Sequence, residues 1–150
     1  MDERQRLRAA KAAQGVRSLQ HQATHFALLA AAADERRSAE SVEEQRGNVD
    51  EAFARWSSHL QSDSLDQDGV RRFAHDVTRQ DDSLILAQKT LEASSHQRAL
   101  ANQTNQRAEV SAAQATAALR LLRRRAFRRR DERALRALED RVAYDHRTET

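Results

Sequence analysis

Ser64, Asp66 and Asp68 carry oxygen-bearing side chains at every second position, and Gly69 follows them directly. This is the spacing with which an EF-hand calcium loop begins. Counted from Ser64, the twelfth position of such a loop requires a bidentate Glu, but His75 stands there. The ninth position, where an oxygen ligand belongs, is the cation Arg72. Because Ser and Asp also form turns and helix N-caps, the segment predicts a turn that leads into a helix.

His21 and His25 lie one helical turn apart and could face the same metal ion. No Glu stands beside His21, as a zinc-protease helix requires, and no third ligand is evident. The acidic pairs at residues 43–44 and 81–82 stand among arginines, which is typical of surface ion pairs. The residue order also contains no phosphate-binding glycine loop, nucleophile elbow or catalytic triad. We therefore expect no enzyme activity, no catalytic residue, no metal, no cofactor and no small-molecule substrate.

The most unusual feature of the sequence is a dense group of positively charged side chains near its C-terminus. Seven of the eleven residues at positions 120–130 are Arg and none is acidic; we call these seven the Arg cluster. Residues 119–150 hold eleven basic and six acidic residues, whereas the net charge of the whole chain is only +3. The positive charge is therefore concentrated in the C-terminal fifth of the sequence, where an anionic partner would bind.

The composition favours long helices that position these groups. The chain has 150 residues with 33% charged and 4% aromatic residues, three Gly, no Pro and no Cys, and much of its apolar content is Ala. Ala forms helices well but buries little surface. Disorder is the alternative for so polar a chain. The longest apolar run, residues 26–33, is far shorter than the roughly 20 residues that span a bilayer. We expect no membrane insertion and a cytoplasmic protein.

Apolar and small residues recur at spacings of three and four, which predicts two amphipathic helices. In the first helix, about residues 3–60, two runs are offset by one residue, and Gly47 is tolerated inside the helix. The predicted seam of this helix is Ala9, Ala12, Val16, Leu19, Ala23, Phe26, Ala30 and Ala33, then Ala39, Val42, Arg46, Val49, Phe53, Trp56 and Leu60. After a turn at about residues 61–68, the second helix covers about residues 69–146. Its predicted seam is Val70, Phe73, Val77, Gln80, Leu84, Ala87, Leu91, Ser94, Arg98, Ala101, Asn105, Ala108, Ala112, Ala115, Leu119 and Leu122.

A short connection makes consecutive helices antiparallel neighbours. The predicted fold is therefore all-α, a long antiparallel two-helix coiled-coil hairpin in which residues 1–150 form one elongated domain. This fold places Trp56 against Phe73 and Leu7 near residue 123, and the second helix extends about 20 residues past the start of the first. Polar and Ala residues in the seam predict a marginally stable middle. The alternative is a parallel dimer of extended chains, joined at the Ser- and Asp-rich segment.

The hairpin brings a second set of basic residues to the Arg cluster. Both ends of the chain then meet at the end opposite the turn, which predicts an anion-binding open end. We consider an acidic protein surface and nucleic acid, and nucleic acid is less suited because aromatic residues for base stacking are scarce. The predicted binding residues are Arg4, Arg6, Arg8, Lys11, Arg120, Arg123, Arg124, Arg125, Arg128, Arg129 and Arg130.

With a shorter first helix, a longer second helix and an Arg-rich segment that leads into residues 131–139, the chain resembles the FliJ/YscO stalk family of type III secretion and flagellar export. Its high Arg and Ala content suits the plant-pathogen Hrp branch of that family. The resemblance implies a non-enzymatic stalk whose paired ends bind the hexameric secretion ATPase and whose body contacts the export-gate protein. Some members of the family also handle export chaperones. The implied location is cytoplasmic, peripheral to the inner-membrane export apparatus.

Within this resemblance, Phe73 and Val77 match the family's gate-contacting pattern, an early Phe followed four residues later by an aliphatic residue. The heptads instead place both residues in the intramolecular seam, where Phe73 would pack against Trp56. Two other functions stay open: a dimeric coiled-coil scaffold or secretion chaperone, and a basic helical nucleic-acid-binding protein.

Overall fold

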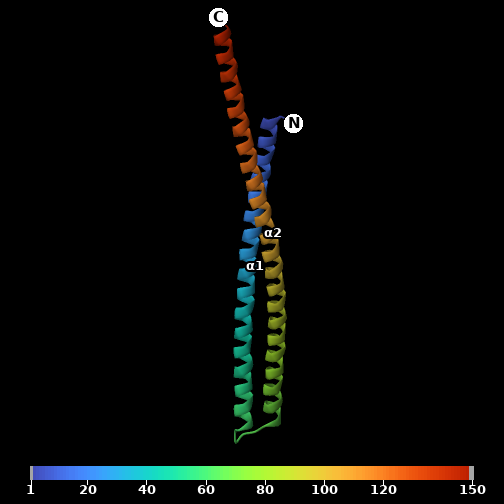
Figure 1. Cartoon of the computed structure of the whole chain (residues 1–150). Coiled ribbons are helices and arrows are strands. Elements are labelled where there is room, and N and C mark those ends of the chain that lie inside the picture. Colours follow the sequence, from blue (N-terminus) through green and yellow to red (C-terminus); the bar gives the residue numbers. More distant parts are fainter. Residues whose placement is uncertain (1, 149–150) are drawn as a thin grey trace. The chain divides into compact units, whose positions relative to one another are not determined.

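The computed structural model describes residues 2–148, and the side chains of residues 2–144. Two helices make up nearly all of this part of the chain: α1, Glu3–Leu60 with 58 residues, and α2, Gln67–Thr148 with 82 residues. They pack against each other as an antiparallel hairpin without strands in the described residues, which confirms the predicted fold class (Figure 1). None of the described helices has a stretch long and apolar enough to cross a membrane.

The chain divides into two compact units, which are described separately. The turn unit comprises Thr24–Asn105, and the terminal unit comprises Met1–Ala23 together with Gln106–Thr150. Each unit contains one segment of α1 and one segment of α2. The predicted helix bounds differ from those in the structure by no more than two residues, because α2 begins at Gln67 instead of residue 69 and ends at Thr148 instead of residue 146.

In the turn unit, side-chain caps end α1 and begin α2. The hydroxyl of Ser62 donates a hydrogen bond to the carbonyl oxygen of His59 at 2.9 Å, which satisfies one of the last free carbonyls of α1. Asp66 precedes α2, and its carboxylate accepts a hydrogen bond from the backbone N–H of Gly69. Its carbonyl oxygen accepts from the backbone N–H of Val70 at 3.1 Å. The predicted turn and N-cap are therefore confirmed, with Asp66 as the capping residue.

Beside this turn, the ring of His59 packs on the ring of Phe73, with their centroids 5.0 Å apart. Trp56 was predicted to face Phe73, but its ring packs on Phe53 at 5.7 Å in an edge-to-face arrangement. The difference arises because His59, which lies one turn after Trp56 on the same inward side of α1, is the residue that stands opposite Phe73. His59 also lies directly over Gly69, where a Cβ atom would meet the imidazole ring.

The inward face of α1 differs from the predicted one. In the turn unit Val42 and Ala52 are buried and Val49 and Trp56 are half-buried, whereas Phe53 is 53% exposed. The inward residues of this unit follow one phase without the predicted offset: Leu28, Ala31, Glu35, Ser38, Val42, Gln45, Val49, Ala52, Trp56 and His59. The prediction was thus right at Ala39, Val42, Val49 and Trp56, which are buried or half-buried. It was wrong for Phe26, Ala30, Ala33, Arg46, Phe53 and Leu60, which are exposed.

The same correction applies to α1 in the terminal unit. Leu7 and Ala10 are half-buried, whereas Val16 is 53% exposed and Leu19 is 66% exposed. The predicted residues Ala9, Ala12, Val16, Leu19 and Ala23 therefore lie on the outer side of α1. An uninterrupted heptad phase avoids the local unwinding that an offset between two runs would require. The more apolar stripe of α1 is consequently left uncovered by α2.

The predicted seam of α2 is confirmed at nearly every position. In the turn unit Ala87 and Asn105 are buried, and in the terminal unit Leu119 is buried. The other predicted seam residues are half-buried except Arg98, which is exposed as a residue and extends its guanidinium toward α1. A seam of more than seven uninterrupted heptads was therefore sufficient to place this helix.

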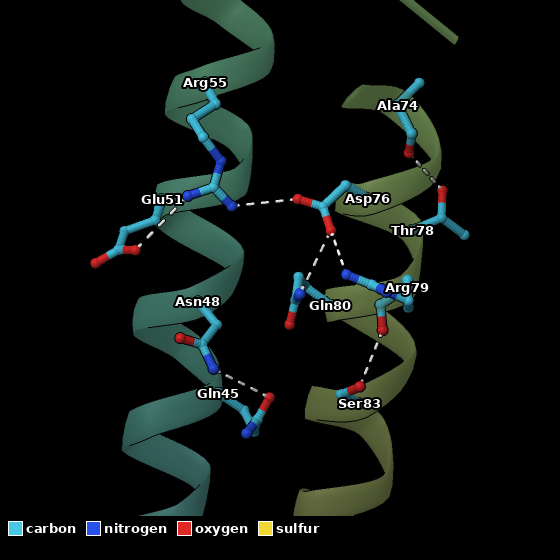
Figure 2. Close-up of polar contacts among 10 residues, drawn as sticks. All are labelled: Gln45, Asn48, Glu51, Arg55, Ala74, Asp76, Thr78, Arg79, Gln80 and Ser83. Carbon is cyan, nitrogen blue, oxygen red and sulfur yellow. Dashed lines mark hydrogen bonds and ion pairs between the residues drawn. The ribbon is translucent and has the colours of Figure 1, made fainter. Parts of the chain in front are cut away.

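Polar pairs join α1 to α2 across the seam of the turn unit. Thr24 donates to the Asn105 side-chain oxygen at 3.2 Å, and the hydroxyls of Ser38 and Ser94 share a hydrogen bond at 2.9 Å. Nearer the turn, Figure 2 shows Arg55 of α1 reaching Asp76 of α2, with 3.2 Å between nitrogen and oxygen. These bonds each satisfy a polar group that would otherwise weaken the seam.

The best-connected cross-helix group is Glu35, whose two carboxylate oxygens accept hydrogen bonds from Ser95 at 2.8 Å and from Arg98 at 2.5 Å. The bond from Arg98 is the main reason that the pKa of Glu35 is below its ordinary value, and the bond from Ser95 adds to it. The hydrogen bond from Arg55 likewise lowers the pKa of Asp76. Both carboxylates therefore stabilise the hairpin in their charged form.

These lowered pKa values predict acid sensitivity. A carboxylate with a lower pKa in the folded state contributes stability above its unfolded pKa and loses it as the pH falls through the folded pKa. We expect the melting temperature to fall below about pH 4, near the ordinary range of such groups. Circular dichroism melts should show a shallower acid loss for Glu35→Gln than for Glu43→Gln, whose carboxylate pairs only within α1. Identical acid profiles for the two variants would contradict the role of Glu35.

The contact between His59 and Gly69 predicts opposite effects for two glycine substitutions. Gly69→Ala would place a Cβ 2.9 Å from His59 Cε1 and 3.0 Å from an Asp66 carboxylate oxygen, so the ring must move, at a cost of about 1–3 kcal/mol. Gly47→Ala meets no atom within 4 Å and should stabilise α1 by about 1 kcal/mol. Urea denaturation measures both changes, and equal stability of the two variants would rule out the contact.

Candidate anion-binding end

The candidate site lies in the terminal unit, where the start of α1 meets α2. The backbone N–H of Asp2 donates to the Gln5 side-chain oxygen at 3.1 Å, and the N–H of Arg6 donates to the Asp2 carbonyl at 3.0 Å. The first bond is one half of a capping box, and the second is the first backbone hydrogen bond of the helical turn that begins α1. Leu7 and Leu122 lie on the same cleft between the helices, which confirms the expectation that Leu7 lies near residue 123.

Arginines from both helices line this cleft, whose volume is about 760 Å³. Asp2 and Glu3 are its acidic residues, and Leu7, Leu122 and Ala126 form its apolar part. Six positive and two negative side chains leave an excess of four positive charges around the cleft. The six arginines are Arg4, Arg6, Arg125, Arg129, Arg130 and Arg133.

The structure brings together only part of the predicted binding set. Arg4, Arg6, Arg125, Arg129 and Arg130 share the cleft. The other predicted residues are exposed in the same unit but lie outside the cleft lining: Arg8, Lys11, Arg120, Arg123, Arg124 and Arg128. The prediction missed Arg133, although its spacing of four from Arg129 and eight from Arg125 places it on the same side of a helix.

No carboxylate in the described residues forms an ion pair with the Arg cluster. The ion pairs of the described residues join other groups, such as Arg37 with Asp34 and Arg46 with Glu43. Every member of the Arg cluster is exposed. Side chains of one sign at this density repel one another, and an anion in the cleft would reduce this repulsion.

The Arg cluster surrounds α2 instead of forming a single stripe. The side of α2 that faces α1 here carries Leu119, Leu122 and Ala126, which are buried or half-buried. The seven arginines therefore project from the remaining sides, because eleven consecutive residues make about three helical turns. An anionic surface can reach them from every direction that α1 leaves open.

Beyond the cleft, α2 continues past the start of α1 (Figure 1). All described side chains from Phe127 to Tyr144 are exposed. We call residues 134–144 the overhang. Its position agrees with the predicted extension of the second helix past the first.

The predicted gate-contacting pair lies in the turn unit. Phe73 and Val77 are both half-buried, and the ring of Phe73 packs on His59. Both side chains thus belong to the intramolecular seam, as the heptads indicated, and a gate contact through them stays a prediction.

The remaining candidates from the sequence are scattered. Asp81, Asp82, Glu43 and Glu44 are exposed. In the part of the chain that the structure describes, no three His, Cys, Asp or Glu side chains gather closely enough to hold a metal ion. Among the described residues, the arginines of the basic cleft are therefore the candidate functional site.

The chain matches no protein-family model, no curated protein and no solved structure. Its own residues consequently carry the functional argument.

The unpaired arginines predict a stability gain on their removal. Replacing Arg125, Arg129 and Arg130 by Gln should raise the melting temperature at low salt. Each repulsive pair removed should increase the free energy of unfolding by about 0.2–0.5 kcal/mol. The gain should disappear at high salt, because the Debye length falls from about 30 Å at 0.01 M to about 3 Å at 1 M. Scanning calorimetry at both salt concentrations measures it.

The matched control replaces Arg37, Arg46 and Arg79, each of which pairs with a carboxylate on its own helix. This control should show no gain at either salt concentration. Equal behaviour of the two triple variants would show that the cleft is not strained by its own charge.

Proposed function

We propose that this chain is a non-enzymatic stalk component of a type III secretion system, which binds the hexameric secretion ATPase through its basic end and couples it to the export gate. The observation that carries the proposal is the gathering of arginines from both helices of the terminal unit, without acidic partners among the described residues. The resemblance to the FliJ/YscO family supplies the identity of the partners.

A ring-shaped partner suits the way in which these arginines are arranged. A flat anionic surface could engage the cleft or one side of α2, but it would leave the other arginines of the cluster without partners. An acidic lumen can surround the helix and meet all of them. Arg is also the residue that pairs most readily with carboxylates at interfaces, through its two parallel N–H donors.

Nucleic acid is the second candidate, because phosphates also neutralise an Arg-rich helix. The apolar residues of the cleft are Leu7, Leu122 and Ala126, so it lacks an aromatic side chain on which a base could stack. Retention on DNA that falls steeply with salt, without binding to the ATPase, would favour this candidate.

A dimeric scaffold or secretion chaperone is the third candidate, and the uncovered apolar side chains of α1 favour it. Val16 and Leu19 are more than half exposed in the terminal unit, as Phe26 is in the turn unit. The stalk proposal expects a monomer of 17.1 kDa, whereas a scaffold of this type would have twice that mass by light scattering.

The gate and chaperone contacts belong to the same proposal. The turn unit is the part of the stalk that would contact the export gate at the inner membrane, with export chaperones as further partners. Phe73 and Val77 can take part only when the packing of His59 on Phe73 opens, because both side chains are half-buried.

Charge reversal tests the proposed ATPase contact. The wild-type chain should bind the hexameric secretion ATPase and stimulate ATP hydrolysis, and Arg125, Arg129 and Arg130→Glu should abolish most of this stimulation. The control reverses Arg37, Arg46 and Arg79, which should retain it. Stimulation that survives reversal of the cluster would refute the assigned role, and a wild-type chain that neither binds nor stimulates the ATPase would refute the proposed function.

A further inference from the structure

The cleft of the terminal unit carries apolar side chains between its arginines. Leu119 is buried in the seam, but Leu122 and Ala126, farther along α2, are only half-buried. Leu7 of α1 is also half-buried. Leu7, Leu122 and Ala126 form the apolar part of the cleft lining, and we call them the apolar floor. Apolar surface is therefore exposed to solvent at the seam itself, and a ligand that covers it would gain free energy.

The charge around the apolar floor is positive even when every neighbouring carboxylate is counted. Residues 2–11 include four basic and two acidic residues, and residues 119–133 include eight basic and two acidic ones. Asp2 and Glu3 line the cleft, whereas the other two acidic residues do not. None of these four carboxylates forms an ion pair among the described residues. The cleft therefore favours an anionic ligand.

The combination of apolar floor and arginines distinguishes between classes of anion. An inorganic phosphate would pair with the guanidinium groups but would leave the apolar floor uncovered. A nucleic acid could cover the floor only with its bases, and no aromatic side chain is among the described residues that line the cleft, so a base has no ring to stack on. A peptide segment can carry carboxylates and an aliphatic side chain together, so it can satisfy both parts of the site.

The dimensions of the cleft fit a short segment of a partner protein. Its volume of about 760 Å³ lies within the roughly 300–1,000 Å³ of sites that bury a ligand of drug size. Along α2, Arg125, Arg129 and Arg133 line the cleft at spacings of four, which span about 12 Å of helix. An extended chain covers this length in about four residues. Several side chains of a partner can therefore enter the cleft together.

We infer that the cleft binds an acidic peptide segment of a partner protein, with a large aliphatic side chain on the apolar floor and flanking carboxylates paired with arginines of both helices. The inference rests on the proposed function only for the identity of the partner, which is then the secretion ATPase. It adds that recognition depends on an aliphatic side chain of the partner as well as on negative charge.

Two synthetic peptides test the inference without the ATPase. The first has the sequence Glu-Glu-Leu-Leu-Glu-Glu with blocked termini, and the second has Ser in place of both Leu, so their charges are equal. The wild-type chain should bind the Leu peptide at least about tenfold more tightly than the Ser peptide, because only the Leu peptide covers the apolar floor. Titrations followed by methyl NMR measure both affinities, and the Leu peptide should shift the resonances of Leu7 and Leu122.

Matched pairs of leucine substitutions then locate the aliphatic contact. Leu7→Ala with Leu122→Ala should reduce the preference for the Leu peptide at least about fivefold, since most of the apolar floor is removed. The control, Leu19→Ala with Leu121→Ala, removes one exposed Leu from each helix of the terminal unit outside the cleft lining and should keep the preference. Where circular dichroism shows lost helix content in a variant, the two affinities of the wild-type chain still decide.

Matched pairs of arginine substitutions locate the charged contact. Arg125→Gln with Arg129→Gln should weaken the binding of both peptides at least about tenfold, because hydrogen bonds between charged groups are lost. The control, Arg123→Gln with Arg124→Gln, changes the net charge equally at exposed positions outside the cleft lining and should weaken it far less. Equal weakening by the two pairs would overturn the inference.

Equal affinities of the wild-type chain for the two peptides would also overturn the inference, and they would leave the proposed function intact because the Arg cluster could still bind the ATPase by charge. A preference for the Leu peptide in a chain that does not bind the ATPase would keep the inference and refute the proposed function. Single-stranded oligothymidylate that binds more tightly than the Leu peptide and displaces it would assign the cleft to nucleic acid. A wild-type dimer that the Leu peptide dissociates would assign the cleft to a second copy of the chain.

Discussion

The packing of α1 on α2 depends on polar pairs, because the chain buries so few large apolar side chains. Among the described residues the buried apolar ones are Val42, Ala52, Ala87 and Leu119, and two of these four are Ala. Apolar contacts of this size give little preference for one alignment over another. Hydrogen-bonded partners do, since a shifted alignment leaves each of them unsatisfied. In the turn unit, Ser38 with Ser94 and Glu35 with Arg98 supply this preference.

The terminal unit differs from the turn unit in how its charged side chains are paired. The turn unit pairs its charges across the helices, as Arg55 does with Asp76. In the terminal unit, Arg4 and Arg6 of α1 stand with Arg125, Arg129 and Arg130 of α2 on one cleft without such partners. These arginines therefore add no ion pair to the hairpin among the described residues, and in the proposed function they bind an anionic partner. This contrast, more than the helices themselves, supports a stalk with a receptor at its basic end.

The sequence was informative where one pattern dominated. In α2 a single heptad phase ran without competitors, so its seam and bounds were predicted almost completely. The Asp66 cap was also predictable, because Ser and Asp followed by Gly have few other structural uses. The meeting of arginines from both helices followed from antiparallel pairing and charge, but only five of the eleven predicted residues line the cleft, and Arg133 was overlooked.

Prediction failed in α1 because this helix carries two stripes at heptad spacing. The outer one, with Val16 and Leu19 in the terminal unit, is more apolar than the inner one, with Gln14 and His21. A search for hydrophobic periodicity therefore selects the wrong side. The correct side is set by hydrogen bonds to α2, such as that of Thr24 with Asn105, which no single-helix pattern reveals. The predicted contact of Trp56 with Phe73 was wrong for a similar reason. Which residue of α1 lies opposite Phe73 depends on where the turn ends, and in the structure it is His59.

The central claim is that the start of α1 and the Arg cluster form one site, and a proximity measurement tests it most directly. The chain has no Cys, so Arg6→Cys and Arg129→Cys can be labelled specifically with pyrene. Both positions line the cleft. The account predicts excimer fluorescence from the doubly labelled chain that persists on dilution and is absent from a mixture of the two singly labelled chains. Pyrene monomer emission alone, or an excimer that disappears on dilution, would contradict it.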